Sequence, residues 1–221
     1  MTLVLPGIDA LIRLRDGNQR FVADVRSITS LASYTRRGEL PDAPPPVAIV
    51  LGCADARVPA EIVFDQGLGD LFVIRVAGNI VAPSQVGSVE FAASRFGTRL
   101  VVVLGHSRCG AIAATIEDIR SGAPNPSSNL RSIVDRIRPS VEGLFATELA
   151  RDERALTAHA VRANVRASAN HLRHGSPLLE KLIHDDGLLV VGAEYALDSG
   201  KVEFFDGVPA ALTASAQSAI Q

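Results

Sequence analysis

The chain has 221 residues, of which 47% are hydrophobic and 21% charged, and its formal net charge at pH 7 is −2. A balance this close to neutral lacks the electrostatic attraction with which proteins bind nucleic acids or anionic membranes, so we expect neither partner.

The longest apolar runs, at 47–52 and 100–105, are far shorter than the roughly 20 residues that span a bilayer. Residues 1–6 are too short for the apolar part of a signal peptide, which favours the cytoplasm. In that reducing compartment, Cys53 and Cys109 are expected to serve a metal or catalysis rather than a disulfide.

We expect one domain over residues 1–221 that begins with a helical arm within residues 1–40. Apolar residues recur there at roughly helical spacing, although Gly17 weakens the middle of the first helix. This amphipathic helix has no obvious partner in a compact sheet domain, so we expect its apolar face to pack against a second subunit. The apolar series is Leu11, Leu14, Phe21, Val22 and Val25.

A second short helix is expected over 28–37. The proline-rich run 41–46 predicts an extended connector, because three successive prolines neither continue a helix nor pair inside a sheet.

A sheet core is expected over residues 47–206, where apolar, β-branched runs alternate with helical patterns. Continuous apolar strands separated by helices predict an α/β fold with a mostly parallel central sheet flanked by helices. The expected strands are 47–51, 71–76 and 100–104; the expected helices are a short one opened by Pro59, then 84–96 and 111–120.

The last part of the core is predicted to hold more helix and a terminal strand hairpin. The tail 213–221 is small and polar, and we expect it to be flexible. The expected helices are 129–144 and 151–174, and the expected hairpin strands are 188–195 and 201–205.

Two of the expected strands run into residues that could bind a metal. The first leads into a C-x-D-x-R motif formed by Cys53, Asp55 and Arg57, and the third leads into an H-x-x-C motif formed by His106 and Cys109. Sites in open parallel sheets form at the carboxyl ends of strands. If these strands are neighbours, two thiolates, an imidazole and a carboxylate meet at one point, and tetrahedral zinc takes such a ligand set.

Each of these residues alone has an ordinary explanation. A lone cysteine after a strand is usually a small buried hydrophobe, a lone histidine usually makes a hydrogen bond, and Asp-x-Arg is usually a local ion pair. Here, however, both cysteines of the chain fall at strand ends, each with a second potential ligand two or three residues away. We therefore favour a metal site.

The motifs resemble those of the β-class carbonic anhydrases, over most of the chain from about residue 11 to 205. The resemblance implies a zinc enzyme that reversibly hydrates carbon dioxide to bicarbonate and a proton, built as a dimer or a dimer of dimers. The matching segments are 14–21, 53–57, 59–61, 69–75, 78–79, 88–91 and 105–110.

The resemblance also implies a role for each residue of the two motifs. Cys53, His106 and Cys109 are zinc ligands, and the fourth position belongs either to Asp55 or to a water molecule. Arg57 holds Asp55 away from the metal by paired hydrogen bonds, which opens the site, and the carboxylate then orients the attacking water. Two thiolates neutralise a divalent ion, so we expect hydration activity that rises toward alkaline pH.

Carbon dioxide is small and apolar, and it requires a dry pocket rather than charged groups. By the resemblance, Phe72, Ala77 and Phe91 line this pocket, although core packing is the simpler explanation for Phe72. The backbone N–H of Gly110, at the start of a helix, is placed to meet a bicarbonate oxygen.

The chain departs from the family pattern at three positions. Pro44 stands where many members have a glutamine that binds substrate, and Phe91 stands where many have tyrosine. Val50 replaces a tryptophan with which one subgroup binds inhibitory bicarbonate, although Arg75 matches the arginine of that subgroup.

Two other functions are compatible with the same residues. Specialised relatives with this zinc constellation hydrolyse carbon disulfide or carbonyl sulfide. A non-catalytic structural-zinc module, or a nucleotide-binding α/β domain without turnover, is the second alternative; 52–55 is not a glycine-rich phosphate loop, which disfavours nucleotide binding.

Overall fold

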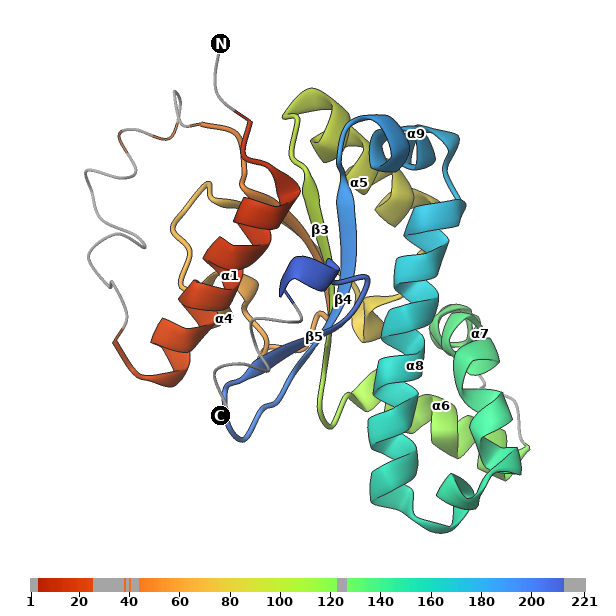
Figure 1. Ribbon diagram of the computed structural model, residues 1–221. Coiled ribbons are helices and arrows are strands. Elements are labelled where there is room, and N and C mark those ends of the chain that lie inside the picture. Colours follow the sequence, from red (N-terminus) through yellow and green to blue (C-terminus); the bar gives the residue numbers. More distant parts are fainter. Residues whose placement is uncertain (1–3, 26–37, 39, 41–43, 123–126, 213–221) are drawn as a thin grey trace.

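The computed structural model describes residues 4–25, 38, 40, 44–122 and 127–212. Its central sheet consists of β1 (Ala48–Gly52), β2 (Leu71–Arg75), β3 (Leu100–His106), β4 (Leu189–Tyr195) and β5 (Val202–Asp206). Their order is β2-β1-β3-β4-β5 (Figure 1). β1 to β4 are parallel to one another, and β5 is antiparallel to β4. The predicted mostly parallel sheet with a terminal hairpin is therefore confirmed.

Helices flank this sheet within the described ranges. They are α1 (Gly7–Val22), α4 (Ala60–Val63), α5 (Pro83–Arg95), α6 (Gly110–Ser121), α7 (Ser128–Val141), α8 (Glu153–His174) and α9 (Pro177–Asp185). Short 3-10 turns lie at Ala77–Asn79, Glu142–Ala146 and Glu148–Arg151. None of the helices in the described ranges combines the length and the apolar character that crossing a bilayer requires.

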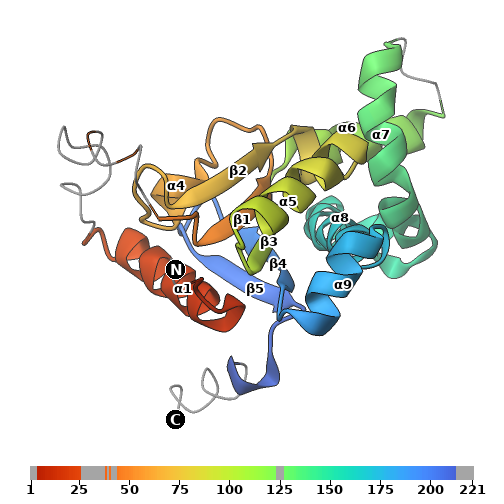
Figure 2. The ribbon, with the colours of Figure 1, turned by 90° about the horizontal axis from the view of Figure 1, so that it is seen from above.

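The helices form a layer on each face of the sheet (Figures 1 and 2). α1 and α4 cover one face, where they pack on Val50 and Val102; α5, α8 and α9 cover the other, where they pack on Ile49 and Val101. Successive strand residues thus alternate between two apolar layers, and both faces are buried, which explains why β1 and β3 are apolar at almost every position. α6 and α7 pack on α8 beyond the carboxyl ends of the strands and form a third apolar cluster.

Leu11, Leu14 and Phe21 of α1 pack within their own chain, so the expectation that this apolar face lacks a partner there is wrong for most of the series. Val22 and Val25, at the end of the series, are 38% and 67% exposed. Leu11 and Leu14 are fully buried against α4 and the sheet. Gly17 lies so close to the carbonyl oxygen of Phe64 that a Cβ atom would be 1.9 Å from it. The glycine that weakens the helix in isolation is therefore what allows this close approach.

Asn18 fixes the far end of α1 to two other elements. Its side-chain amide donates to the carbonyl oxygens of Val63, at 3.0 Å, and Gly200, at 2.9 Å, and its oxygen accepts from the N–H of Val202 at 2.8 Å. These bonds join α1 to the end of α4 and to the β4–β5 turn. Sequence patterns do not reveal such long-range partners.

Most element bounds differ from the predictions by one to three residues, and two differences affect the description of the fold. β3 continues through Gly105 to His106, two residues beyond the expected end, because both residues pair with β4. The helix α9 was not expected; its signal is Ser176, whose hydroxyl accepts from the N–H of Leu179 at 3.2 Å, followed by Pro177 at the first helical position. The expected helix over 28–37 and the tail 213–221 lie outside the described residues.

Because α1 is buried on one face only, truncating a side chain on that face should destabilise the protein more than truncating one on the opposite face. Leu14→Ala should lower the free energy of unfolding by about 2–5 kcal/mol, as buried leucine truncations do. Ile12→Ala, two residues away at a side chain that is 39% exposed, should change it by less than about 0.5 kcal/mol. Urea unfolding measures both values, and equal losses would contradict the packing described here.

Candidate metal centre

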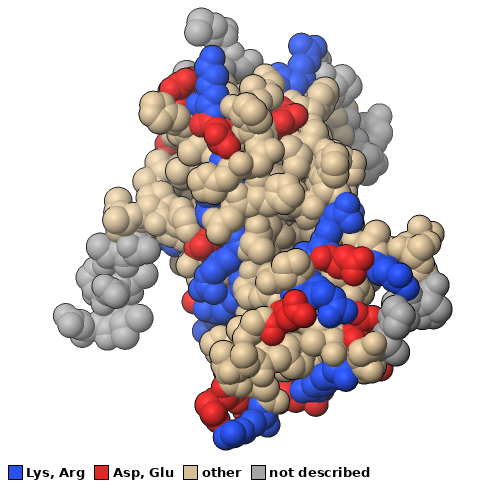
Figure 3. Space-filling view, turned by 90° about the vertical axis from the view of Figure 1, so that its right-hand side faces the viewer, with Lys and Arg blue, Asp and Glu red and all other residues tan. Residues whose placement is uncertain are grey.

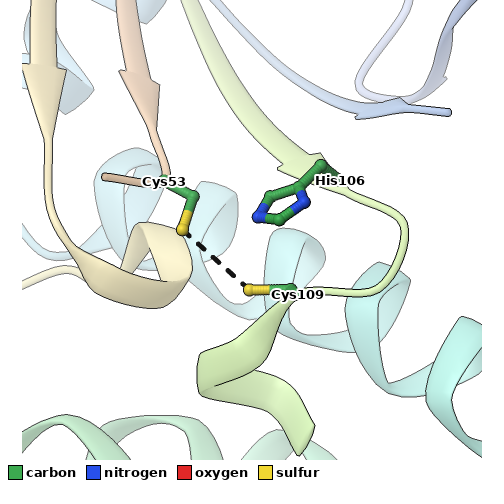
Figure 4. Close-up of side chains that lie close together, drawn as sticks. All are labelled: Cys53, His106 and Cys109. Atoms are coloured by element: carbon green, nitrogen blue, oxygen red, sulfur yellow. Dashed lines mark hydrogen bonds between the residues drawn. The ribbon is translucent and has the colours of Figure 1, made fainter. Parts of the chain in front are cut away.

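Two neighbouring strands bring the potential metal ligands together. β1 pairs with β3, with Gly52 opposite Leu104, so their carboxyl ends lie side by side. Cys53 follows β1, His106 is the last residue of β3, and Cys109 immediately precedes α6 (Figure 4). The condition on which the predicted site depended, that the two strands are neighbours, is met.

The three side chains form a compact buried cluster. Their candidate ligand atoms all lie within 4.8 Å of one another, and the two sulfur atoms are 4.0 Å apart. Cys53 is 4% exposed, Cys109 1% and His106 0%. Neither cysteine forms a disulfide. The three donor atoms are therefore close enough together to bind a single ion.

The orientation of the His106 ring is fixed by its other nitrogen. Nδ1 lies 3.0 Å from the carbonyl oxygen of Ser107, which can only accept, so Nδ1 carries the proton. The lone pair is then on Nε2, which is buried and has no hydrogen-bond partner among the described residues. A buried nitrogen without a partner is costly in an apolar setting. A metal ion satisfies it, and ligating histidines are commonly oriented in this way.

Several donors stabilise a thiolate at Cys53. The Cys109 thiol and backbone N–H groups, among them that of Gly78 at 3.4 Å, lower the pKa of Cys53 against the opposing effect of burial. The pKa of Cys109 is raised, because its thiol keeps the proton that it donates to Cys53 and is itself buried. A cation bound between the sulfurs would remove the need for this shared proton.

Asp55 and Arg57 form a paired ion contact at the rim of the cluster. Arg57 Nε donates to Asp55 Oδ1 at 2.9 Å and Nη2 donates to Oδ2 at 2.6 Å, and the Arg57 backbone N–H also reaches Oδ1 at 2.9 Å. These bonds hold the pKa of Asp55 well below its usual range. Asp55 Oδ2 lies 3.9 Å from His106 Nε2, yet the carboxylate is outside the three-residue ligand cluster. In this structure Asp55 is therefore held by Arg57 and is not one of the three clustered donors.

The loops that carry the ligands are themselves braced. Arg75, at the end of β2, donates to the carbonyl oxygens of Cys53 at 3.1 Å and Asp55 at 2.5 Å. On the other side, the Ser107 N–H donates to Tyr195 O at 2.9 Å and its hydroxyl accepts from Leu197 N at 3.0 Å. Arg75 therefore supports the loop that carries Cys53 and Asp55. This structural role accounts for the arginine without the bicarbonate site of the subgroup that it matches.

The four predicted substrate-binding residues fall in two places. Ala77 begins the turn whose next residue, Gly78, contacts Cys53, and Gly110 directly follows Cys109. Phe72 and Phe91 instead pack together with Phe96, with ring centroids 5.6–6.4 Å apart. Phe72 is opposite Ile49, four residues before Cys53, which places it roughly 13 Å along the strand from the cluster.

Sequence reasoning missed three polar residues that support the site. Ser107 braces the ligand turn as described, and Asn164 and Ser168 of α8 bond the carbonyl oxygens of the 77–79 turn. Asn164 and Ser168 are four apart, so they share one helix face, and both are buried in a region that is otherwise apolar. Two buried polar residues at this spacing were the signal available in the sequence.

The fold and the site together define a class: an α/β protein with a two-sulfur, one-nitrogen metal centre at the carboxyl edge of a parallel sheet. This donor set suits borderline-soft divalent ions.

Comparison with known proteins gives the family. Residues 48–202 match the model of the carbonic anhydrase family. Carbonic anhydrase 2 of Mycobacterium tuberculosis is 37% identical over 195 residues, covering 88% of this chain and 91% of the relative. The carbonic anhydrase of Mycolicibacterium smegmatis is 38% identical over 190 residues, covering 86% and 89%. The solved β-carbonic anhydrase CafA of Aspergillus fumigatus has the same fold, with a TM-score of 0.70 at 22% identity and 94% of each chain covered.

This chain belongs to the β-class carbonic anhydrases, the carbonate dehydratases that interconvert carbon dioxide and bicarbonate.

The cluster predicts that one histidine of the chain controls metal content. His106→Ala should lower the metal retained after dialysis from about one equivalent per chain to a small fraction, because it removes one of three protein donors. His184→Ala is the matched control, since the His184 side chain is 88% exposed. Elemental analysis distinguishes them, and equal metal content in the two variants would rule out the cluster as the binding site.

Proposed function

We propose that this protein catalyses the zinc-dependent, reversible hydration of carbon dioxide at the cluster of Cys53, His106 and Cys109. The observation that carries the proposal is the Nε2 of His106, which has no hydrogen-bond partner in the described part of the chain and faces two buried sulfurs that lie 4.0 Å apart. Two thiolates with an imidazole are ligands that zinc takes in proteins. When bound there, zinc would lower the pKa of a water molecule and so supply hydroxide at neutral to alkaline pH.

In this proposal, Asp55 orients the attacking water by accepting its proton in a hydrogen bond. Arg57 supports that role, because its two hydrogen bonds keep the carboxylate ionised and fix its position beside the cluster. The same bonds keep Asp55 from serving as a fourth ligand in the arrangement described. Asp55 as a metal ligand, in a closed and inactive site, stays a prediction that requires Arg57 to release it.

Substrate and product would be held at the start of α6. The N–H of Gly110 lies at the amino end of a twelve-residue helix, where backbone donors and the helix dipole favour an anion such as bicarbonate. The space beyond its Cα is open, with no atom within 4 Å of where a Cβ would lie. Ala77 would line the apolar side of the same pocket.

Phe72 and Phe91 support a proposed dimer or tetramer. They are too far along the sheet to line the pocket of their own chain, so they would reach it only from a second copy. Phe91 is 54% exposed beside Phe72 and Phe96, an apolar surface that a partner subunit would cover. Two tetrameric β-carbonic anhydrases of Sordaria macrospora share the fold, with a TM-score of 0.68 at 24% identity.

A cytoplasmic location belongs to the same proposal and is supported by the two thiols, which are unpaired and needed as metal ligands. Both positive and negative side chains lie on the face that Figure 3 shows. No described feature favours carbon disulfide or carbonyl sulfide as the substrate. A purely structural zinc site has no use for Asp55, which is held ionised at its rim.

Removal of the arginine should reduce turnover without removing the metal. Arg57→Ala should retain about one zinc per chain and lower kcat/KM for hydration by roughly 10- to 100-fold, the usual effect of losing a partner of the metal site. Arg136→Ala, an exposed arginine on α7 that bonds only within its own helix among the described contacts, is the control. Stopped-flow hydration assays with zinc analysis test this, and full activity in the Arg57 variant would refute the role assigned to Arg57.

A further inference from the structure

The turn Ala77–Asn79 approaches the metal centre through one backbone group. The N–H of Gly78 donates to the sulfur of Cys53 at 3.4 Å, and both residues are buried. Gly78 has φ +68°, and a Cβ at this position would lie 2.8 Å from Ile137 and 3.0 Å from Ala111. The turn is therefore confined between the ligand loop, α6 and α7, and only glycine fits it.

The opposite side of this turn is bound to α8. The side-chain amide of Asn164 donates to the carbonyl oxygen of Gly78 at 2.8 Å, and the hydroxyl of Ser168 donates to that of Asn79 at 3.0 Å. Asn164 is 2% exposed and Ser168 5% exposed, so water does not compete for these bonds. Without them, two buried carbonyl oxygens would lose their partners and the turn would relax.

We propose that Asn164 and Ser168 are positioning residues of the metal centre. They hold the 77–79 turn so that the Gly78 N–H stays directed at the Cys53 sulfur. This inference rests on the proposed function in one respect, because it takes Cys53 to be a metal ligand.

An N–H donor on a ligand sulfur changes what the metal receives from it. The hydrogen bond draws electron density from the thiolate, which weakens its donation and leaves the metal a stronger Lewis acid. In a buried site this hydrogen bond is not screened by water, and no water replaces it when it is lost. Its loss should therefore change the donation of the Cys53 sulfur to the metal measurably. The hydrogen bonds from α8 thus act on the metal through two intermediate groups, the turn carbonyls and the Gly78 N–H.

The experiment compares cobalt-substituted protein with and without these side chains. In Asn164→Ala and in Ser168→Ala, the sulfur-to-cobalt charge-transfer band should move to longer wavelength, because a thiolate without its N–H donor is oxidised more easily. Zinc competition should show about 10- to 100-fold weaker metal binding, because a Cys53 sulfur that is no longer held in position binds less tightly even though it donates more strongly. Ser168→Thr keeps the hydroxyl and should restore the band to its original position.

A control separates positioning from a general loss of stability. Leu172→Ala truncates a fully buried side chain on the same helix, away from the turn. It should lower the midpoint of thermal unfolding while leaving the cobalt spectrum unchanged. If Asn164→Ala does not fold, Ser168→Ala and Ser168→Thr form a complete test on their own.

The outcomes distinguish this inference from the function on which it rests. A wild-type protein that takes up no cobalt and shows no sulfur charge-transfer band would overturn both. A wild-type band that is unchanged in Asn164→Ala and Ser168→Ala would overturn the positioning role alone. A shift of equal size in Leu172→Ala would also overturn it, since general loosening of α8 would then be the cause.

Discussion

The site depends on the pairing of β1 with β3 in the middle of a parallel sheet. Cys53 and Cys109 are 56 residues apart in the chain, and only this pairing brings the end of one strand beside the end of the other. Parallel strands end at the same edge, so residues that follow them necessarily converge there. Both strands are buried on both faces, which keeps their register fixed and gives the cluster a rigid base.

The metal centre combines a dry interior with an open rim. The three candidate ligands are buried, and backbone groups orient two of them: the carbonyl of Ser107 orients His106, and the N–H of Gly78 orients Cys53. The Asp55–Arg57 pair lies at the edge, where the Arg57 side chain is 53% exposed. The buried ligands favour tight binding of a metal, whereas the exposed pair leaves access for a small substrate and for protons. Asp55 and Arg57 follow Cys53 by two and four residues, so the chain leaves the buried cluster and places the ion pair at its exposed edge.

Local patterns predicted the strands, the parallel sheet and the metal motifs, because each of these is encoded in short runs of residues. They did not predict the position of α1, since the partner of its apolar face, which includes Phe64, is set by tertiary packing. The resemblance predicted that Phe72 and Phe91 line the pocket, yet within one chain both lie farther along the sheet, away from the metal centre. The spacing of Asn164 and Ser168 marks them as a pair on an apolar helix face, but their partners are backbone carbonyls more than 80 residues away, which no periodicity reveals.

The central claim, that Cys53, His106 and Cys109 together hold one zinc ion, is tested most directly by X-ray absorption at the zinc edge of the purified protein. We expect two sulfur atoms at about 2.3 Å and one imidazole nitrogen at about 2.0–2.1 Å, with a light-atom fourth ligand. A first shell of nitrogen and oxygen alone would place the metal elsewhere on the protein and contradict the account.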